Sequence, residues 1–326
     1  MKSKFIFCVI CLFILTGCRQ SETLDKTIRI GHFPSTTHAQ ALLLRENNLL
    51  KDLLGDEYTL TFKSFKAGSA EIEAFLSEEI DIGYIGPIPA INGFVKSKGE
   101  LLILSGASNS GIGLIVQKDS NIYSLKNLQN KKIAIPQLGN TQHIKLLEIL
   151  DKEGLRDTHR GGNVDIYPIS NDLILQTFEN GDIDGAYLPE PWGSQLVEDG
   201  QAKWLIEPSS EEIQSAAVIL VRKDYLATHP KEVELFLKAH QEVTIMLNDN
   251  RTKYLETIKE QIQSLSGKTL SKDTIKKSLE HVVFDTSLSS QTIQYYIDLF
   301  YEQGFIDTPI NADDIISSPS SIKEKN

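Results

Sequence analysis

Short apolar runs alternate with segments of helical periodicity along the first part of the chain. Runs rich in Ile, Tyr and Phe predict strands, and the Leu- and Ala-containing segments between them predict helices. The predicted strands cover 28–30, 58–62, 80–85 and 101–104, and the predicted helices begin near Thr37 and Glu71. This alternation is typical of α/β proteins, in which helices flank largely parallel sheets.

The same plan occurs twice in the sequence. A strand, a proline and a helix start containing threonine and histidine follow one another at 28–38 and again at 132–143. Further along, FLSEEID at 75–81 resembles FENGDID at 178–184, and a tyrosine follows each segment three residues later. Chance matching of short motifs is the alternative. The repeat predicts two lobes, each a mixed, mostly parallel sheet flanked by helices.

Two apolar strands are expected to carry the chain between the lobes. Gly113–Val116 would lead into the second lobe, and Ala217–Val221 would lead back. We therefore expect lobe 1 over 27–113, lobe 2 over 114–216, and a return strand with C-terminal helices over 217–326 that pack on lobe 1. Helix-start signals occur in this last region at Pro230, Ser271 and Ser289.

The N-terminus has the features of a bacterial export signal. Lys2 and Lys4 form a positively charged segment before an apolar run over 5–15, which is shorter than the ~20 residues of a membrane-spanning helix. Residues 15–18 (LTGC) look like a lipobox, whose cysteine is acylated. We expect a signal peptide over 1–17, a lipid anchor at Cys18 and a tether over 18–26. An ordinary signal peptide or a buried N-terminal helix is the alternative.

Composition excludes several classes of function. All three cysteines lie within the first eighteen residues, which leaves no disulfide framework, thiolate metal site or cysteine nucleophile in a processed chain. The net charge of −11 argues against binding of nucleic acid, which needs clustered Lys and Arg. The sequence has no nucleophile elbow, zinc-protease helix or P-loop. We expect no catalysis, no metal and no cofactor.

The candidate ligand-binding residues follow the strands, because a parallel sheet presents the carboxyl ends of its strands to a crevice. They are Thr36, Thr37, His38, Gly86, Pro87, Asn109 and Ser110 in lobe 1, and Asn140, Thr141, Gln142, Glu190 and Trp192 in lobe 2. The threonines could be plain helix caps or could hold a ligand near free backbone N–H groups. The loops with Gly86 and Asn109 could be mere turns, and Trp192 could belong to the core.

An anion is the expected ligand. Two helix starts, at Thr37 and Thr141, would aim their positive ends into one cleft, and the candidate segments contain neutral donors without Lys or Arg. Glu190 is the exception, since it could bind a ligand amine and would suit an amino sulfonate, or it could pair with an arginine.

Four segments resemble the substrate-binding lipoproteins of the nitrate, sulfonate and taurine importers, and most of all the aliphatic sulfonate-binding group. They are GHFPSTTHAQAL, AGSAEIEAFLSEEIDIGYIGP, KKIAIPQLGNTQH and YLPEPWGSQL, between Ile28 and Leu196, with a fainter match over 217–225. The resemblance implies a type II periplasmic-binding-protein fold that closes on its ligand, and a cleft lined by the candidate residues. It also implies delivery to an ABC permease and its ATPase from the outer face of the cell membrane.

Several ligands and roles stay open under this resemblance. An aliphatic sulfonate or taurine is the first expectation, and nitrate or a thiamine-precursor pyrimidine is the alternative. An enzyme acting on small metabolites is a reading of another class, because the same fold hosts a few enzymes. A sensor that docks to a membrane receptor is a third. We expect a monomer that meets the membrane through its lipid anchor alone.

Overall fold

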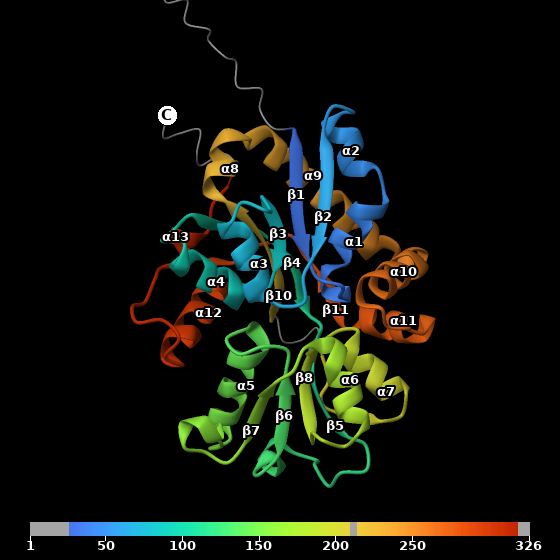
Figure 1. Cartoon of the computed structure of the whole chain (residues 1–326), viewed down its shortest axis with the longest axis vertical. Helices are drawn as coiled ribbons and strands as arrows, with labels where there is room; N and C mark the ends of the chain where they lie inside the picture. The colour runs from blue at the N-terminus through green and yellow to red at the C-terminus, as the bar shows by residue number, and fades with distance from the viewer. Residues whose placement is uncertain (1–25, 209–213, 319–326) are drawn as a thin grey trace, which may run out of the picture.

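The computed structural model describes residues 26–208 and 214–318. The chain forms two lobes, each built on one β-sheet with helices on its faces, and the lobes are stacked along the long axis of the molecule (Figure 1). The expected α/β, two-lobed architecture is confirmed. The expected signal peptide, Cys18 and the tether up to residue 25 lie outside the described residues.

The first sheet has six strands in the order β11-β4-β10-β3-β1-β2. β1 (Thr27–His32) lies next to the edge strand and pairs in parallel with β2 (Thr59–Ser64) and with β3 (Ile82–Ile85). Antiparallel strands complete it, namely β4 (Leu101–Ser110), β10 (Ser215–Arg222) and β11 (Val282–Phe284). The three parallel strands end at the same edge, which faces the second lobe.

The second sheet repeats this arrangement with five strands in the order β7-β6-β8-β5-β9. β6 pairs in parallel with β7 and β8, and β5 lies antiparallel between β8 and β9. The bounds are β5 (Ile112–Gln117), β6 (Lys132–Ile135), β7 (Asp165–Pro168), β8 (Gly185–Pro189) and β9 (Ala202–Ile206). β6, β7, β8 and β5 therefore correspond to β1, β2, β3 and β10, as the sequence repeat predicts.

Both sheets contain fewer parallel pairs than expected. Four strand pairs are parallel and five are antiparallel. The reason is that each sheet receives a strand from the chain crossing between the lobes, and β5 and β10 enter antiparallel to β8 and β3.

Helices follow the parallel strands and cover the sheets. In lobe 1 they are η1 (Thr36–His38), α1 (Ala39–Glu46), α2 (Leu49–Leu54), α3 (Gly68–Leu76) and α4 (Pro87–Lys96). In lobe 2 they are η2 (Leu125–Leu128), α5 (Thr141–Lys152), η3 (Thr158–Arg160), α6 (Asn171–Glu179) and α7 (Trp192–Glu198). The helical spacing of apolar residues explains their packing, since Ile144, Leu147 and Leu150 of α5 recur every third residue and are buried.

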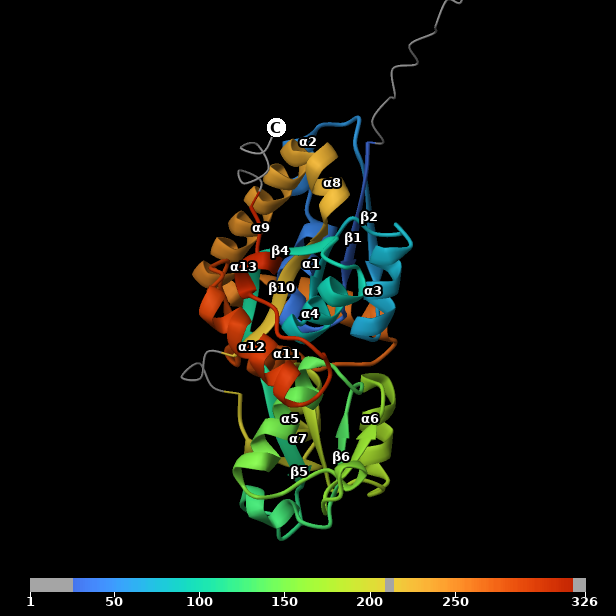
Figure 2. The same ribbon diagram turned by 90° about the vertical axis from the view of Figure 1, so that its left-hand side faces the viewer.

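The C-terminal helices contact both lobes. They are α8 (Lys223–Thr228), α9 (Pro230–Asn250), η4 (Arg251–Tyr254), α10 (Leu255–Ser266), α11 (Lys272–Glu280), α12 (Ser290–Glu302) and α13 (Ala312–Ile315). α9 packs on α1 and α2, whereas α11 packs on α7, and α12 contacts both α4 and α5. Packing on lobe 1 alone is therefore too narrow a description, because α11 and α12 lie at the seam between the lobes (Figure 2).

The start signals of these helices are confirmed. Pro230 is the first residue of α9. The side chains of Ser271 and Ser289 accept hydrogen bonds from the backbone N–H groups of Thr274 and Thr292, so each serine caps its helix.

The chain crosses from the first sheet to the second at a tight turn. β4 runs to Ser110 and β5 begins at Ile112, and Ser110 and Gly111 have φ values of 61° and 74°. The expected loop containing Asn109 is therefore wrong. Ala107 to Ser110 extend β4, where Asn109 pairs with Ser215 and Val283.

In the ranges 26–208 and 214–318, none of the helices has both the length and the apolar composition needed to cross a lipid bilayer.

Candidate functional site

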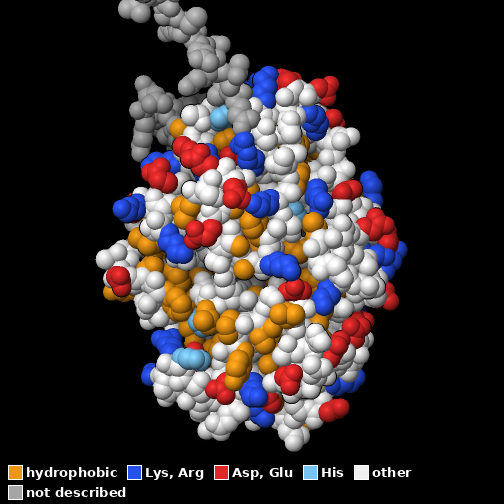
Figure 3. All heavy atoms as spheres, viewed as in Figure 1, with side chains coloured by type: hydrophobic (Ala, Val, Ile, Leu, Met, Phe, Trp, Pro, Cys, Tyr) orange, Lys and Arg blue, Asp and Glu red, His pale blue; other side chains and the backbone are white. Residues whose placement is uncertain are grey.

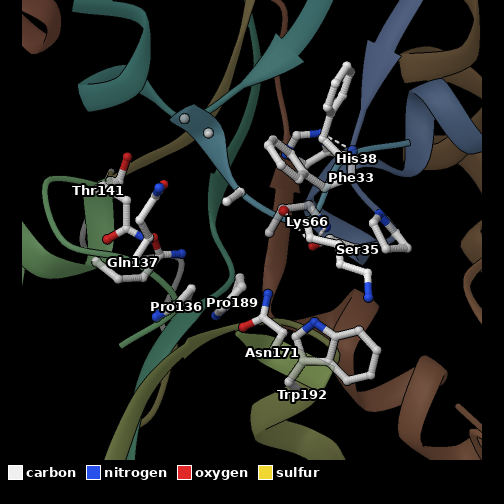
Figure 4. A pocket seen from close by; sticks show the side chains of 18 of the residues that line it. Phe33, Ser35, His38, Lys66, Pro136, Gln137, Thr141, Asn171, Pro189 and Trp192 are labelled. Atoms are coloured by element: carbon white, nitrogen blue, oxygen red, sulfur yellow. Dashed lines mark hydrogen bonds between the residues drawn. The ribbon is translucent and has the colours of Figure 1, made fainter. Parts of the chain in front are cut away.

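A cavity of about 170 Å³ lies between the two lobes. Side chains from both lobes surround it (Figure 4). A single water needs only roughly 10–15 Å³ on this measure, so the cavity can hold a small solute. It is lined by Phe33, Pro34, Ser35, Thr37, His38, Ser64, Phe65, Lys66, Ala67, Gly68, Gly86, Pro89, Ile112, Pro136, Gln137, Asn140, Thr141, Gln142, Asn171, Asp172, Pro189, Trp192, Ala216, Leu265 and Ser266.

Four helices of eight residues or more begin at this cavity after parallel strands. They are α3, α4, α5 and α6, which contribute Gly68, Gly86, Thr141 and Asn171 to its wall. The N-cap residues of α3, α4 and α6 make no capping hydrogen bond with their own side chains, although Oε1 of Gln137 accepts from the N–H of Ser69 in α3. Backbone N–H groups and the positive ends of several helix dipoles therefore point toward one small space, which favours a negative charge there.

At the start of α5, one residue caps the helix and the next has a hydroxyl that is free to contact a ligand. Oδ1 of Asn140 accepts a hydrogen bond of 2.8 Å from the N–H of His143, so Asn140 is the cap. The hydroxyl of Thr141 is buried and has no hydrogen-bond partner among the described residues. Thr141 is thus free to donate to a molecule in the cavity.

Gly86 faces Thr141 across the cleft. A Cβ atom placed on Gly86 would lie 2.6 Å from Oγ1 of Thr141, which is closer than real contacts allow. Glycine at this position lets the backbone of lobe 1 approach the start of α5.

The turn after β1 is capped by Ser35 rather than by a threonine. Oγ of Ser35 accepts from the N–H of Thr37 at 3.2 Å and donates to the carbonyl of Glu190 at 2.6 Å. His38 lies beside it in the cavity wall, and its Nδ1 accepts from the N–H of Phe33 at 3.4 Å. Burial, with a smaller effect of His32, lowers the pKa of His38 to about 3, so the imidazole is neutral at physiological pH.

Glu190 does not line the cavity. Its side chain is fully buried and accepts hydrogen bonds from Oγ of Ser194 at 2.7 Å and from Nδ1 of His281 at 2.5 Å. The expectation that Glu190 binds a ligand amine therefore finds no support here, and its partner is a histidine rather than an arginine.

Seven of the twelve predicted ligand residues line the cavity, namely Thr37, His38, Gly86, Asn140, Thr141, Gln142 and Trp192. Five do not, namely Thr36, Pro87, Asn109, Ser110 and Glu190. Thr36 is buried and its N–H donates to the carbonyl of Glu190, Pro87 is the first residue of α4, and Asn109 and Ser110 belong to β4.

One cross-lobe ion pair in the wall was not predicted. Nζ of Lys66, which follows β2, lies 2.9 Å from Oδ2 of Asp172 in the first turn of α6. Lys66 is the one Lys or Arg side chain among the described residues of the wall, and it comes from a loop outside the candidate segments. The repeat makes the loops after β2 and β7 equivalent, and both reach the cavity, but it does not identify Lys66 and Asp172 as partners.

Much of the remaining wall is apolar. Phe33, Phe65, Ile112, Trp192 and Leu265 line it together with four prolines. Among the described residues, no three His, Cys, Asp or Glu side chains are grouped as metal ligands. The site thus combines a pole suited to an anion with an apolar surface.

The chain is similar to several known proteins. The sequence profile of the NMT1-like family matches residues 21–259. A Bacillus subtilis protein that is named as an aliphatic sulfonates-binding protein is 26% identical over 98% of this chain and 95% of its own length. The taurine-binding periplasmic protein of Escherichia coli is 29% identical over 56% of this chain and 55% of its own. The alkanesulfonate-binding protein of Xanthomonas axonopodis pv. citri, solved with MOPS, superposes with a TM-score of 0.75 at 23% identity, covering 90% of this chain and 98% of that one.

Proposed function

The chain belongs to the NMT1-like family, and from this membership and the cavity we propose that it is an extracytoplasmic binding protein that captures an organic sulfonate for an ABC importer. The names of its Bacillus subtilis and Escherichia coli relatives, which refer to aliphatic sulfonates and taurine, support this proposal.

The convergence of helix starts on one cavity is the observation that carries the proposal. A sulfonate presents three oxygen acceptors and one negative charge. The unpaired hydroxyl of Thr141 and the free N–H groups in the first turns of α3 and α5 offer donors for such a group. The first turn of α4 adds fewer donors, because Pro87 and Pro89 have no N–H. Hydrogen bonds to a charged group contribute about 1.5–3 kcal/mol each, so a few of them suffice for tight binding.

The apolar part of the wall favours a sulfonate with a carbon tail over nitrate. Phe33, Phe65 and Trp192 would remain against a small polar ion if nitrate were bound, whereas an alkyl tail would bury their surface. Each buried methylene contributes about 0.8 kcal/mol. Taurine is a less favourable ligand than a simple alkanesulfonate, because its ammonium group would compete with Lys66 for Asp172.

The proposed ligand residues are Thr37, His38, Gly86, Asn140, Thr141, Gln142 and Trp192. Lys66 and Asp172 already link the lobes in this structure, so the lobes would open about the crossing at Gly111 to admit the ligand and then close on it again.

Binding without catalysis fits the site better than an enzyme does. His38 is the one histidine among the described residues of the wall, and its lowered pKa makes it a poor proton acceptor at neutral pH. We propose accordingly that the ligand leaves unchanged and passes to a permease with its ATPase.

Attachment to the outer face of the membrane through Cys18 belongs to the same proposal and rests on the lipobox at 15–18. Cys18→Ser should abolish labelling by a radioactive fatty acid and release the protein or leave it unprocessed. Full labelling of that variant would contradict the anchor.

Isothermal calorimetry with the purified protein tests the ligand class. We expect binding of ethane- to butanesulfonate, weaker binding of taurine, and no heat from nitrate or sulfate. At a hundred times its dissociation constant a ligand should stabilise the fold by about 2.7 kcal/mol, which thermal unfolding detects independently. Tight binding of nitrate without sulfonate binding would refute the proposal.

A further inference from the structure

A second hollow, of about 200 Å³, lies beside the ligand cavity at the seam between the lobes. Pro89 and Gln137 line both spaces, so the two share a wall. The other lining residues of this side groove are Ser69, Ile72, Asn92, Leu138, Gly139, Phe300 and Phe305. They come from α3 and α4, from the loop before α5, and from the end of α12.

A pair of side chains separates the side groove from the cavity. The amide of Gln137 donates to Oγ of Ser69, and the N–H of Ser69 donates back to Oε1 of Gln137 at 3.3 Å. Both contacts are exposed, and they join lobe 1 to lobe 2. Water can replace them, so this partition can open without leaving a buried polar group unpaired.

The side groove is preformed and has an apolar floor, with the polar side chains of Ser69, Asn92 and Gln137 in its wall. Ile72 and Phe300 form a buried floor, and the ring of Phe305 stacks on that of Phe300 with centroids 5.3 Å apart. Leu138 and Phe305 are nonetheless 54% and 39% exposed. Apolar side chains gather across the seam on the face shown in Figure 3, whereas charged side chains are spread over both ends. A wall of this kind is suited to hydrocarbon.

We propose that the side groove is a subsite for the distal tail of the ligand, and this rests on the proposed function. Gly139 lies in the groove and Thr141 in the cavity, at most about 7 Å apart along the backbone. A sulfonate held at Thr141 therefore needs only a short carbon chain to reach the partition between Ser69 and Gln137. The protein then accepts sulfonates whose tails exceed the main cavity, with the tail lying on Phe305 and Leu138.

Calorimetry with a series from ethane- to decanesulfonate tests the subsite. We expect affinity to rise about fourfold for each methylene that becomes buried, and to continue rising for octanesulfonate. Phe305→Asp should weaken octanesulfonate at least tenfold and leave ethanesulfonate within twofold. Tyr301→Asp is the matched control, because Tyr301, near the end of α12, is similarly exposed but does not line the groove, and its replacement should change the affinity for neither ligand.

The outcomes distinguish the two proposals. If ethanesulfonate binds and Phe305→Asp affects long and short tails alike, or neither, the tail subsite is refuted and the proposed function stands. If no sulfonate binds, the proposed function itself fails. Leu138→Asp, at an exposed loop position, repeats the test should Phe305→Asp unfold at a lower temperature than the wild-type protein.

Discussion

Nδ1 of His281 lies 2.5 Å from Oε1 of Glu190, and this contact joins the two lobes. His281 follows α11 and precedes β11 of the first sheet, whereas Glu190 follows β8 of the second. Nε2 of the same ring lies 3.3 Å from Glu207. Two carboxylates therefore face one imidazole from opposite sides and favour its protonated form, in which both nitrogens donate.

Stability should fall as pH rises through the titration of His281. Burial by itself lowers its pKa, but the hydrogen bond and charge of Glu190 and the charge of Glu207 outweigh this and raise the pKa above 6.5. The folded state holds the proton more tightly, so this stabilisation is complete below about pH 6.5 and is lost above the raised pKa. Urea denaturation between pH 6 and 9 measures the slope.

His281→Gln isolates this contribution. The variant leaves a buried carboxylate without its charged partner and should lose about 3 kcal/mol of unfolding free energy at pH 6. Its stability should then depend less on pH than that of the wild-type protein. An equally steep decline in both proteins would assign the pH dependence to other groups.

Glu71 is one such group. Its carboxyl is fully buried beside Gly31 and Gly83, with no hydrogen-bond partner among the described residues, and burial raises its pKa well above 4.5. The free energy of unfolding should therefore fall as the pH rises from 4.5 through the raised pKa of Glu71. Glu71→Gln should match the wild-type protein within about 1 kcal/mol at pH 5. It should be the more stable protein at pH 8, and a lower stability than wild type at pH 8 would show that the carboxylate has a partner.

Alanine substitutions at Thr141 and Asn140 should have different effects on ligand affinity and on the free energy of unfolding. Thr141→Ala should weaken sulfonate binding about tenfold, because it removes a hydrogen bond to a charged group, and should leave the unliganded protein nearly unchanged. Asn140→Ala should lower the unfolding free energy by about 1 kcal/mol, because it removes the cap of α5. Calorimetry and urea denaturation of both variants decide between these roles. Wild-type affinity with reduced stability in Thr141→Ala would make Thr141 a structural residue.

Gly86→Ala should impair closure. The added methyl group would displace the hydroxyl of Thr141 or hold the lobes apart, so affinity should fall at least tenfold. The backbone of Gly86, with φ −65°, suits alanine, and the unliganded protein should gain about 0.4–1 kcal/mol. Small-angle scattering should show a smaller ligand-induced compaction than in wild type. Undiminished compaction with wild-type affinity would refute a close approach at this point.

Local signals in the sequence predicted most of the fold and part of the site. Strand and helix patterns and the internal repeat indicated two sheets of equivalent order, because burial and periodicity are properties of adjacent residues. The identity of the cap at α5 was less accessible, since Asn140 and Thr141 both suit helix starts and only the backbone geometry distinguishes them. Asn109 and Ser110 were misplaced because small polar residues within β4 resemble a loop.

Contacts between distant segments could not be predicted. His281 lies 91 residues from Glu190, and Lys66 lies 106 residues from Asp172. Both pairs depend on how the lobes and the C-terminal helices are placed. None of these four residues lies in a local sequence pattern that distinguishes it from an ordinary surface residue.

The pairing of charges in the cavity wall also affects how ligand binding depends on ionic strength. Lys66 and Asp172 neutralise each other in its wall, so backbone dipoles rather than exposed lysines would meet the negative head of the ligand. Dissolved ions screen exposed charges over about 10 Å at 0.1 M ionic strength, but they act weakly on groups enclosed by protein. The affinity for the ligand should therefore depend little on the ionic strength of the surroundings. A cell that carries the protein could then take up the ligand at the same low concentration in saline and in fresh water.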